Sequence, residues 1–313
     1  MDMPLLYLFS GIVLLGVSGE TLMRGAVSTA LHLRVPPLVI GLTIVALGTS
    51  APELTVSLDA AAAGRPDIAV GNVVGSNIAN VLLVFGLLTL MRPTATPDTS
   101  GDHRRDGMFM LAVSVVFTGL VLSGAVGRVA GVALLAALTA YIAYVYRAAR
   151  SGHEAESPSV AGNMMGGGLG RSLFVLAVGL AGIIWGADLM VEGAVGVARL
   201  WGLSEAAIGL GVVAIGTSLP ELAVSAIALR RGAVGLAVGN IIGSNIANIL
   251  LIIGLTAAVI PLSVADIIAT RDIWVMLAAA ALVMRNMWGR VPRIEGAAYI
   301  ALYALYMAWL YAA

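Results

Sequence analysis

The amino-acid sequence predicts an all-α polytopic membrane protein of ten transmembrane helices, arranged as two inverted five-helix repeats. Three observations support this fold class. The 313-residue chain is 60% hydrophobic and 11% charged, with a mean hydropathy of +1.00, far above that of soluble domains. It contains about ten apolar stretches of roughly 20 residues, the length that crosses a bilayer. A long polar and apolar pattern also occurs twice at constant spacing.

The limits of the ten predicted helices are set by prolines, glycines and arginine clusters. They cover residues 5–31, 37–62, 68–91, 107–125, 129–148, 171–198, 205–229, 234–260, 272–288 and 294–312. Two segments, 92–106 and 150–171, are rich in Gly, Pro, Ser and charge and indicate loops. The second separates a first repeat over 1–149 from a second over 171–313, with 150–170 as a cytoplasmic linker.

The arginine content of the loops predicts the orientation. All 17 basic residues are arginines, and one alternate set of loops holds twelve of them whereas the other holds four. By the positive-inside rule the richer set is cytoplasmic, so both termini are expected on the extracytoplasmic side. We expect a multi-pass protein of the cell membrane, plasma or inner.

The two copies of the pattern are in constant register. "IGLTIVALGTSAPELTVS" at 40–57 matches "IGLGVVAIGTSLPELAVS" at 208–225, and Glu221 follows Glu53 by 168 positions, as Asn248 follows Asn80. The motif regions span 40–87 and 208–255. Because each repeat has an odd number of helices, the second enters the membrane from the opposite side. This is the inverted repeat of many secondary transporters.

Each copy is predicted to break its helix at a proline. Pro52 and Pro220 lack an N–H and clash with the carbonyl four residues earlier. Carbonyls freed at membrane depth persist where protein or a water-lined cavity satisfies them, or where they bind a ligand. The natural ligand of a carbonyl oxygen is a cation.

Polar side chains follow each break at helical spacing. Thr49 and Glu53, like Thr217 and Glu221, are four residues apart and share a helix face, with Ser50 and Ser218 beside them. In the next helices, Asn72, Ser76 and Asn80 form one stripe, and Asn240, Ser244 and Asn248 form its copy. Since the glutamates and the last asparagines lie midway along their helices, we expect them to converge near the bilayer centre.

The ligand set favours a hard cation. It offers carboxylate, amide, hydroxyl and carbonyl oxygens, while the chain has no cysteine and its three histidines lie outside the motifs. Ca²⁺ and Na⁺ suit such oxygens, whereas zinc and copper do not. The motifs contain no arginine, so an anionic substrate would find no counter-charge.

These features also have structural explanations. Gly71 with Gly75, and Gly239 with Gly243, form GxxxG pairs that can bring helices together, and asparagine and serine can link helices by hydrogen bonds. The glutamates argue against packing alone, because a charge at mid-membrane costs about 2.5–3.5 kcal/mol and an interior proline about 3 kcal/mol. Glu20 and Arg24, four residues apart, are predicted to form an ion pair near the cytoplasmic side.

"GTSAPE" with "GNVVGSNIAN", and "GTSLPE" with "GNIIGSNIAN", resemble the two alpha-repeats of the calcium/cation antiporter superfamily, specifically its prokaryotic sodium/calcium exchanger branch. The resemblance covers nearly the whole chain. It implies that Glu53 and Glu221 are carboxylates shared by Ca²⁺ and Na⁺, that Thr49 and Thr217 offer carbonyls to Ca²⁺, and that Asn80 is a central ligand. It also implies flanking Na⁺ sites made by Ser50, Ser76, Ser218 and Ser244 with the carbonyls of Ala46 and Ala214. The best-described exchangers carry Asp at the position of Asn248, so this chain lacks one possible carboxylate.

The expected function is secondary antiport of Ca²⁺ against Na⁺ by alternating access. H⁺ in place of Na⁺ is the alternative, and a passive cation channel is a further one. An enzyme is not expected, because there is no HExxH motif, no cysteine and no histidine near the motif serines. We expect no cofactor and no protein partner. Because the net charge is zero, we also expect no nucleic-acid partner; the partners are the transported ions and the lipid bilayer.

Overall fold

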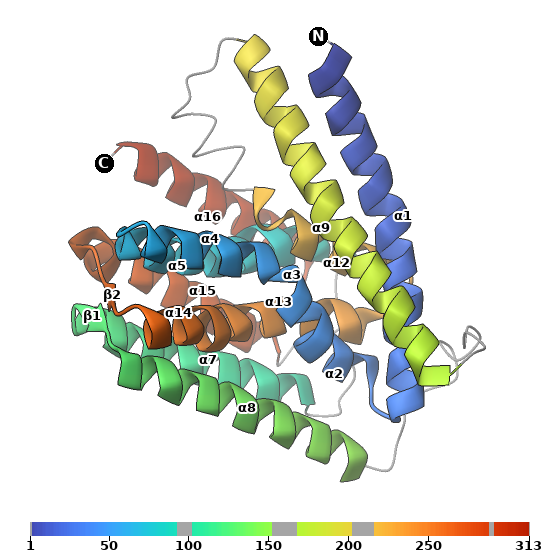
Figure 1. The fold of residues 1–313 in the computed structure, drawn as a ribbon, viewed down its shortest axis with the longest axis horizontal. Helices are drawn as coiled ribbons and strands as arrows, with labels where there is room; N and C mark the ends of the chain where they lie inside the picture. The colour runs from blue at the N-terminus through green and yellow to red at the C-terminus, as the bar shows by residue number, and fades with distance from the viewer. Residues whose placement is uncertain (1, 93–101, 152–167, 202–215, 288–290, 313) are drawn as a thin grey trace. The chain divides into compact units, whose positions relative to one another are not determined.

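The fold is almost entirely helical, in a computed structural model that describes residues 2–92, 102–151, 168–201, 216–287 and 291–312 (Figure 1). The first half contains α1 (Asp2–Leu33), α2 (Pro37–Ile40), η1 (Gly41–Val45), α3 (Ala46–Thr49), α4 (Ala51–Ala62), α5 (Pro66–Ala79), η2 (Asn80–Phe85), α6 (Gly86–Met91), α7 (Asp102–Leu122), β1 (Ala125–Val126) and α8 (Arg128–Ser151). The second contains α9 (Gly168–Leu200), α12 (Leu219–Arg230), α13 (Val234–Ala247), η5 (Asn248–Ile253), α14 (Gly254–Val259), β2 (Leu262–Ser263), η6 (Ile268–Asp272), α15 (Ile273–Asn286) and α16 (Arg293–Ala312). The η elements are π-helical turns within longer helices.

Each predicted helical segment coincides with helix in the structure, although for the segment 205–229 only residues from 216 onward are described. The loop predicted at 92–106 is shorter in the structure, because α7 already begins at Asp102. By length and composition, six described helices can cross a membrane, and a seventh counts if the helices on either side of Ser50 form one span. The membrane-spanning helical class is therefore confirmed, while the number of ten crossings stays a prediction.

The chain divides into two compact units that each combine parts of both sequence repeats. One unit comprises Met1–Thr49 and Val145–Asn240, and the other comprises Ser50–Tyr144 and Ile241–Ala313. The boundaries fall at the break of the first motif, inside α8 and inside α13. We call them the first and the second unit.

In the first unit, the long helices α1 and α9 lie side by side over much of their length (Figure 1). Glycines make this close packing possible. A Cβ atom on Gly25 would lie 2.4 Å from the backbone nitrogen of Leu176, and one on Gly179 would lie 2.4 Å from that of Leu22. Only residues without a side chain let two backbones approach this closely.

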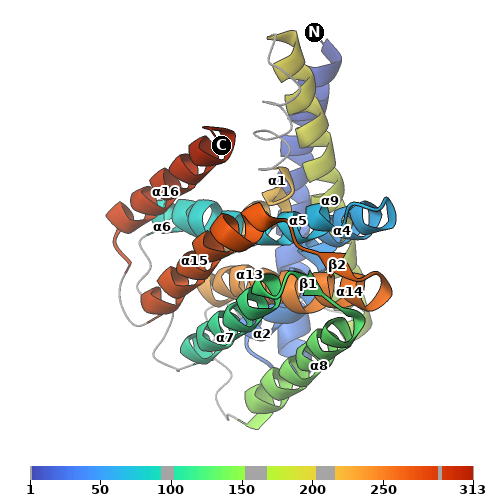
Figure 2. The same ribbon diagram turned by 90° about the vertical axis from the view of Figure 1, so that its left-hand side faces the viewer.

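The second unit packs α4 on α5, α5 on η5 and α15, α7 on α15, and α16 on α6. A short antiparallel pairing of β1 with β2, which the sequence did not predict, aligns Ala125 with Ser263 and Val126 with Leu262 (Figure 2). The amide of Val264 donates to the carbonyl of Gly124 at 3.1 Å. Gly124 has a positive φ of 82°, a conformation that glycine adopts without strain. This pairing ties the α7–α8 connection to the segment after α14.

The predicted helix breaks are confirmed, but the prolines do not occupy a helix interior. The helices end before Ser50 and Ser218, whose backbones have φ −82°, ψ 8° and φ −88°, ψ 3°. Pro52 and Pro220 are the second residues of α4 and α12. An N–H in the first helical turn has no intrahelical acceptor, so proline loses no hydrogen bond there. The expected cost of an interior proline therefore does not apply.

The glycine pairs of the two repeats behave differently. A Cβ on Gly239 would lie 2.6 Å from the carbonyl oxygen of Leu38, so this glycine is required for the packing of α13 on α2. The equivalent Gly71 would bring its Cβ no closer than 3.6 Å to Ile268, and Gly75 would meet nothing within 4 Å. The packing explanation thus holds for Gly239 and not for Gly71 or Gly75.

Candidate ion-binding site

The structure buries nearly all the predicted ligands that it describes. The first unit holds Ala46, Thr49, Ser218 and Glu221, all buried, and the half-buried Thr217. The second unit holds Ser50, Glu53, Ser76, Asn80, Ser244 and Asn248, all buried. Ala214 lies outside the described residues. Burying a polar side chain costs free energy unless the group finds a hydrogen-bond or ion partner. The many buried polar side chains in the motifs therefore need such partners.

The two glutamates occupy the same position in their helices. Glu53 is the third residue of α4 and Glu221 the third residue of α12, and both are 0% exposed. The first turn of a helix presents N–H groups and the positive end of the helix dipole, which stabilise a negative charge. The break at Ser50 and Ser218 thus creates a helix N-terminus at the position where each repeat carries its acid. Because the glutamates belong to different units, their convergence stays a prediction.

An asparagine from the next helix holds each glutamate turn in place. In the second unit, Asn72 Nδ2 donates to the carbonyl oxygen of Glu53 at 3.1 Å and to Ser57 Oγ at 3.0 Å. In the first unit, Asn240 Nδ2 donates to the carbonyl oxygen of Glu221 at 3.4 Å and to the hydroxyl of the serine four residues later, Ser225, at 3.0 Å. The same contacts at the same spacing show that the repeat extends to individual hydrogen bonds.

Thr49 joins the two repeats within the first unit. Its hydroxyl lies 3.3 Å from Oδ1 of Asn240 and 3.3 Å from the carbonyl oxygen of Ala46. Since a hydroxyl carries one proton, these contacts share it. The carbonyl of Ala46, the amide of Asn240 and, through it, the backbone of Glu221 form one connected set of oxygens.

Asparagines also join the two repeats within the second unit. Asn77 Nδ2 donates to the backbone carbonyl of Asn245 at 3.3 Å, and Asn248 Nδ2 donates to Asn77 Oδ1 at 2.9 Å. Asn245 instead donates to the carbonyl of Ile241 in its own helix at 2.8 Å. These bonds connect α5 to α13 and η5 and orient the amide of Asn248.

Both predicted central asparagines begin a π-helical turn. Asn80 starts η2 and Asn248 starts η5, at equivalent positions of the two repeats. π-Helical turns are rare and frequently occur at functional sites. Within the described part of the chain, both amide atoms of Asn80 and Oδ1 of Asn248 are buried without a hydrogen-bond partner. Such buried amides are exceptional in proteins and are commonly explained by an ion or water.

The donor set fits a hard cation and contains few charges. Among the described residues, no three His, Cys, Asp or Glu side chains gather in one place. In the motifs, each unit instead offers one buried glutamate with amide, hydroxyl and carbonyl oxygens around it, which is the ligand type that Ca²⁺ accepts.

Reasoning from the sequence placed Asn72 and Asn240 in a ligand stripe and missed their contacts. Ser57 and Ser225 were not singled out, although each follows its glutamate by four residues and so shares its helix face. Asn77 was also missed. It stands between the predicted ligands Ser76 and Asn80, and nothing in the spacing assigned it a partner 171 residues away.

Several of the known proteins that match this chain are named as exchangers or antiporters. The family described as "Sodium/calcium exchanger protein" matches residues 3–147 and 171–312. The chain is 37% identical over 305 residues to the putative antiporter CaxA of Alkalimonas amylolytica, covering 93% of each chain. It is 34% identical over 344 residues to the sodium/calcium exchanger MaX1 of Methanosarcina acetivorans, covering 98% of each. The solved structure of the sodium-calcium exchanger NCX_Mj, soaked with Na⁺ and Ca²⁺, matches with a TM-score of 0.82 and 30% identity over 98% of both chains.

Proposed function

Because the chain belongs to the sodium/calcium exchanger family, we propose that this antiporter of Ca²⁺ and other cations uses Na⁺ as its counter-ion. The observation that carries cation binding is the pair of fully buried glutamates, one in each repeat, each at a new helix N-terminus and each held by an asparagine; the choice of Na⁺ follows from the relatives. Two relatives that match nearly the whole chain support it, since both are named sodium/calcium exchangers.

The proposed ion site uses oxygens from both repeats. Glu53 and Glu221 supply the charge, and the remaining ligands are neutral: Ala46, Thr49, Ser50, Ser76, Asn80, Ala214, Thr217, Ser218, Ser244 and Asn248. Ca²⁺ takes six to eight oxygens, so it needs neutral donors besides the two carboxylates. Asn72 and Asn240 position the glutamates without binding the ion.

Competition for shared oxygens explains exchange. If Ca²⁺ and Na⁺ use the same glutamates, bound Ca²⁺ excludes Na⁺, and bound Na⁺ excludes Ca²⁺. Two buried carboxylates without cations resist removal from water, so the empty carrier does not readily pass through a dry, closed state. A carrier whose carboxylates are neutralised by bound ions does pass. Binding thereby controls alternating access, and α1 and α9 are the proposed moving helices.

H⁺ is the alternative counter-ion because a desolvated carboxylate can take a proton in place of a metal ion, and both glutamates are 0% exposed. Calcium uptake by the purified protein in proteoliposomes separates the two. An outward Na⁺ gradient at equal pH is expected to drive uptake, and a pH gradient without Na⁺ is not. Uptake driven only by the pH gradient would overturn the sodium assignment, and downhill flux without either counter-ion would indicate a channel.

The residue assignment needs its own control. Glu53→Gln and Glu221→Gln keep the side-chain shape and remove the charge, so each is expected to abolish Na⁺-driven calcium uptake. The control is Glu295 on α16, whose carboxylate pairs with Arg285 of α15 at 3.3 Å. Glu295→Gln is expected to leave calcium uptake unchanged. Normal uptake in either motif variant would exclude that glutamate as an ion ligand.

A further inference from the structure

An open cleft in the first unit lies apart from the proposed ion ligands. It has a volume of about 840 Å³ between α1, α9 and the end of α12. Its charged lining residues are Glu20 and Arg24 on α1 and Arg230 and Arg231 at the end of α12. None of these residues has a part in the exchange mechanism, so the cleft calls for an explanation of its own.

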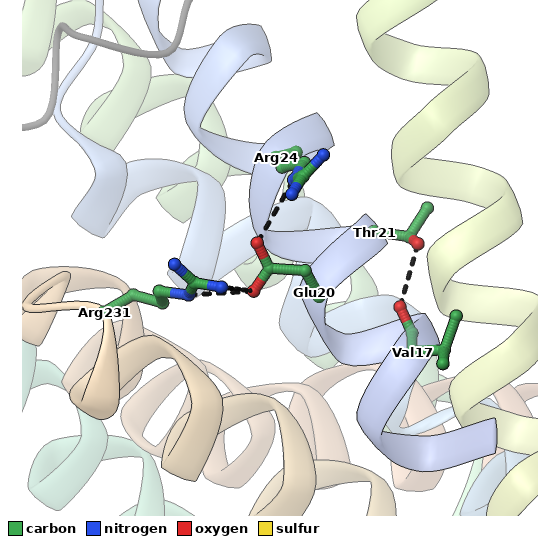
Figure 3. A network of polar contacts seen from close by, with 5 residues as sticks. All are labelled: Val17, Glu20, Thr21, Arg24 and Arg231. Carbon is green, nitrogen blue, oxygen red and sulfur yellow. Dashed lines mark hydrogen bonds and ion pairs between the residues drawn. The ribbon is translucent and has the colours of Figure 1, made fainter. Parts of the chain in front are cut away.

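The predicted ion pair of Glu20 with Arg24 is confirmed, and the structure adds a second arginine to it (Figure 3). Arg24 Nε lies 3.1 Å from Glu20 Oε1, and Arg231 Nη2 lies 2.6 Å from Glu20 Oε2. Arg230 has no ion pair within the described part of the chain. Three guanidinium groups therefore face one carboxylate, which leaves a local surplus of two positive charges.

Most of the guanidinium donors remain available. The side chains of Arg24 and Arg231 are 60% and 58% exposed despite their contacts with Glu20. Those contacts use Nε of Arg24 and Nε and one Nη of Arg231, out of the five N–H groups that each guanidinium carries. The cleft can thus offer several N–H donors to a further anion.

Apart from Thr21, whose hydroxyl donates to the carbonyl of Val17 at 2.9 Å, the rest of the lining is apolar. Val17, Val175 and Ile227 border the cleft, and Val17 is 62% exposed. Gly16 leaves the space beside α1 open, because a Cβ atom there would meet nothing within 4 Å. A ligand that fits both parts has an anionic head and an apolar body.

We propose that this cleft binds the phosphate headgroup of an anionic phospholipid. Guanidinium groups bind phosphate oxygens in a bidentate manner, and an acyl chain can lie along Val17 and Ile227. The loop of Arg230 and Arg231 belongs to the arginine-rich set that the sequence predicts to be cytoplasmic, where anionic lipids attract basic residues. A bound lipid would connect α1 to α12, the helix that carries Glu221.

The test measures lipid binding to the purified full-length protein in a neutral detergent by native mass spectrometry. The probes are dioleoyl phosphatidylglycerol, dioleoyl phosphatidylcholine and soluble glycerol 3-phosphate. Phosphatidylglycerol is expected to bind in preference to phosphatidylcholine. Arg230→Gln, which breaks no ion pair among the described residues, is expected to weaken phosphatidylglycerol binding about fivefold. Arg293→Gln, an exposed arginine on α16, is the matched control and is expected to change nothing.

Two further variants distinguish a lipid site from a purely structural ion-pair network. Glu20→Gln removes the competing carboxylate, so it is expected to strengthen phosphatidylglycerol binding. Gly16→Leu places a side chain in the cleft with every charge retained, and it is expected to abolish the preference for phosphatidylglycerol. Equal binding of the two lipids, no effect of Arg230→Gln, or weaker binding in Glu20→Gln would overturn the proposal. Binding of glycerol 3-phosphate as strong as that of phosphatidylglycerol would assign the cleft to soluble phosphate esters instead.

Discussion

Asn248 donates its amide N–H to Oδ1 of Asn77 at 2.9 Å, and this bond has no counterpart in the other repeat. The equivalent bond would run from Asn80 to Asn245. Asn245 instead donates to Ile241 in its own helix, and the amide of Asn80 makes no hydrogen bond among the described residues. Two identical stretches, "GSNIAN", therefore adopt different hydrogen bonding at the centre of the motifs.

Asn77→Leu is expected to lower the stability of the protein. It removes the acceptor of Asn248 and leaves a buried N–H unsatisfied, which costs about 1–3 kcal/mol. Asn245→Leu is the matched variant, and its cost is expected to be smaller, because the carbonyl of Ile241 keeps its place in the helix ladder. Thermal unfolding of the two purified variants in the same detergent measures the difference. Equal losses would show that the asymmetric bond contributes nothing.

Removing the asparagine that holds a glutamate turn is expected to weaken calcium binding. Asn240→Ala releases the carbonyl of Glu221, and loss of a group that orients a metal ligand typically costs about 10–100-fold in affinity. We expect the apparent KM for Ca²⁺ in exchange to rise at least about tenfold on that basis. Asn72→Ala should have the same effect through Glu53, and Ser225→Ala, which leaves the Asn240 contact with Glu221 intact, should have little. If only one of the variants Asn240→Ala and Asn72→Ala raised the apparent KM for Ca²⁺, the two contacts would not be equivalent.

Alanine is expected to have opposite effects at two equivalent glycines. Gly239→Ala directs a methyl group at the backbone oxygen of Leu38, 2.6 Å away, and such overpacking costs about 1–3 kcal/mol. Gly71→Ala meets Ile268 at an ordinary 3.6 Å and gains helix propensity of up to about 1 kcal/mol. Thermal unfolding in detergent checks both. Destabilisation by Gly71→Ala as large as that by Gly239→Ala would contradict this account of the packing.

The inverted arrangement of the repeats can be tested with single cysteines, since the chain has none. Ala62 and Arg230 are equivalent, exposed residues at the ends of α4 and α12. A membrane-impermeant maleimide added to intact cells is expected to label Ala62→Cys and to label Arg230→Cys only after permeabilisation. Labelling of both from the same side would exclude inversion. Labelling of Arg230→Cys from outside alone would reverse the predicted orientation.

Much of the architecture followed from local chemistry. Pro52 and Pro220 determine where the helices break, because a proline ring excludes the preceding helical turn, and the 168-residue spacing identified equivalent positions without any structure. The burial of Glu53 and Glu221 was likewise expected from their position in apolar segments. These features depend on residues close together in sequence, which a pattern records directly.

The remaining features depend on contacts between distant segments. Arg231 joins Glu20 across 211 positions and Asn248 joins Asn77 across 171, and no periodicity specifies such partners. The sequence cannot predict the different hydrogen bonding of the two "GSNIAN" copies, because their residues are identical. The pairing of β1 with β2 involves only two residues in each strand, in the connections between helices. Two residues are too few to show the alternating pattern that predicts a strand.

The glycines between α1 and α9 restrict how these two helices can move. Gly25 and Gly179 each rest against the backbone of the opposite helix at a distance that admits no side chain. A displacement of α1 along α9 by one or two residues would bring a side chain to each of these points and force the helices apart. We therefore expect α1 and α9 to move together as one rigid pair in any axial motion during transport.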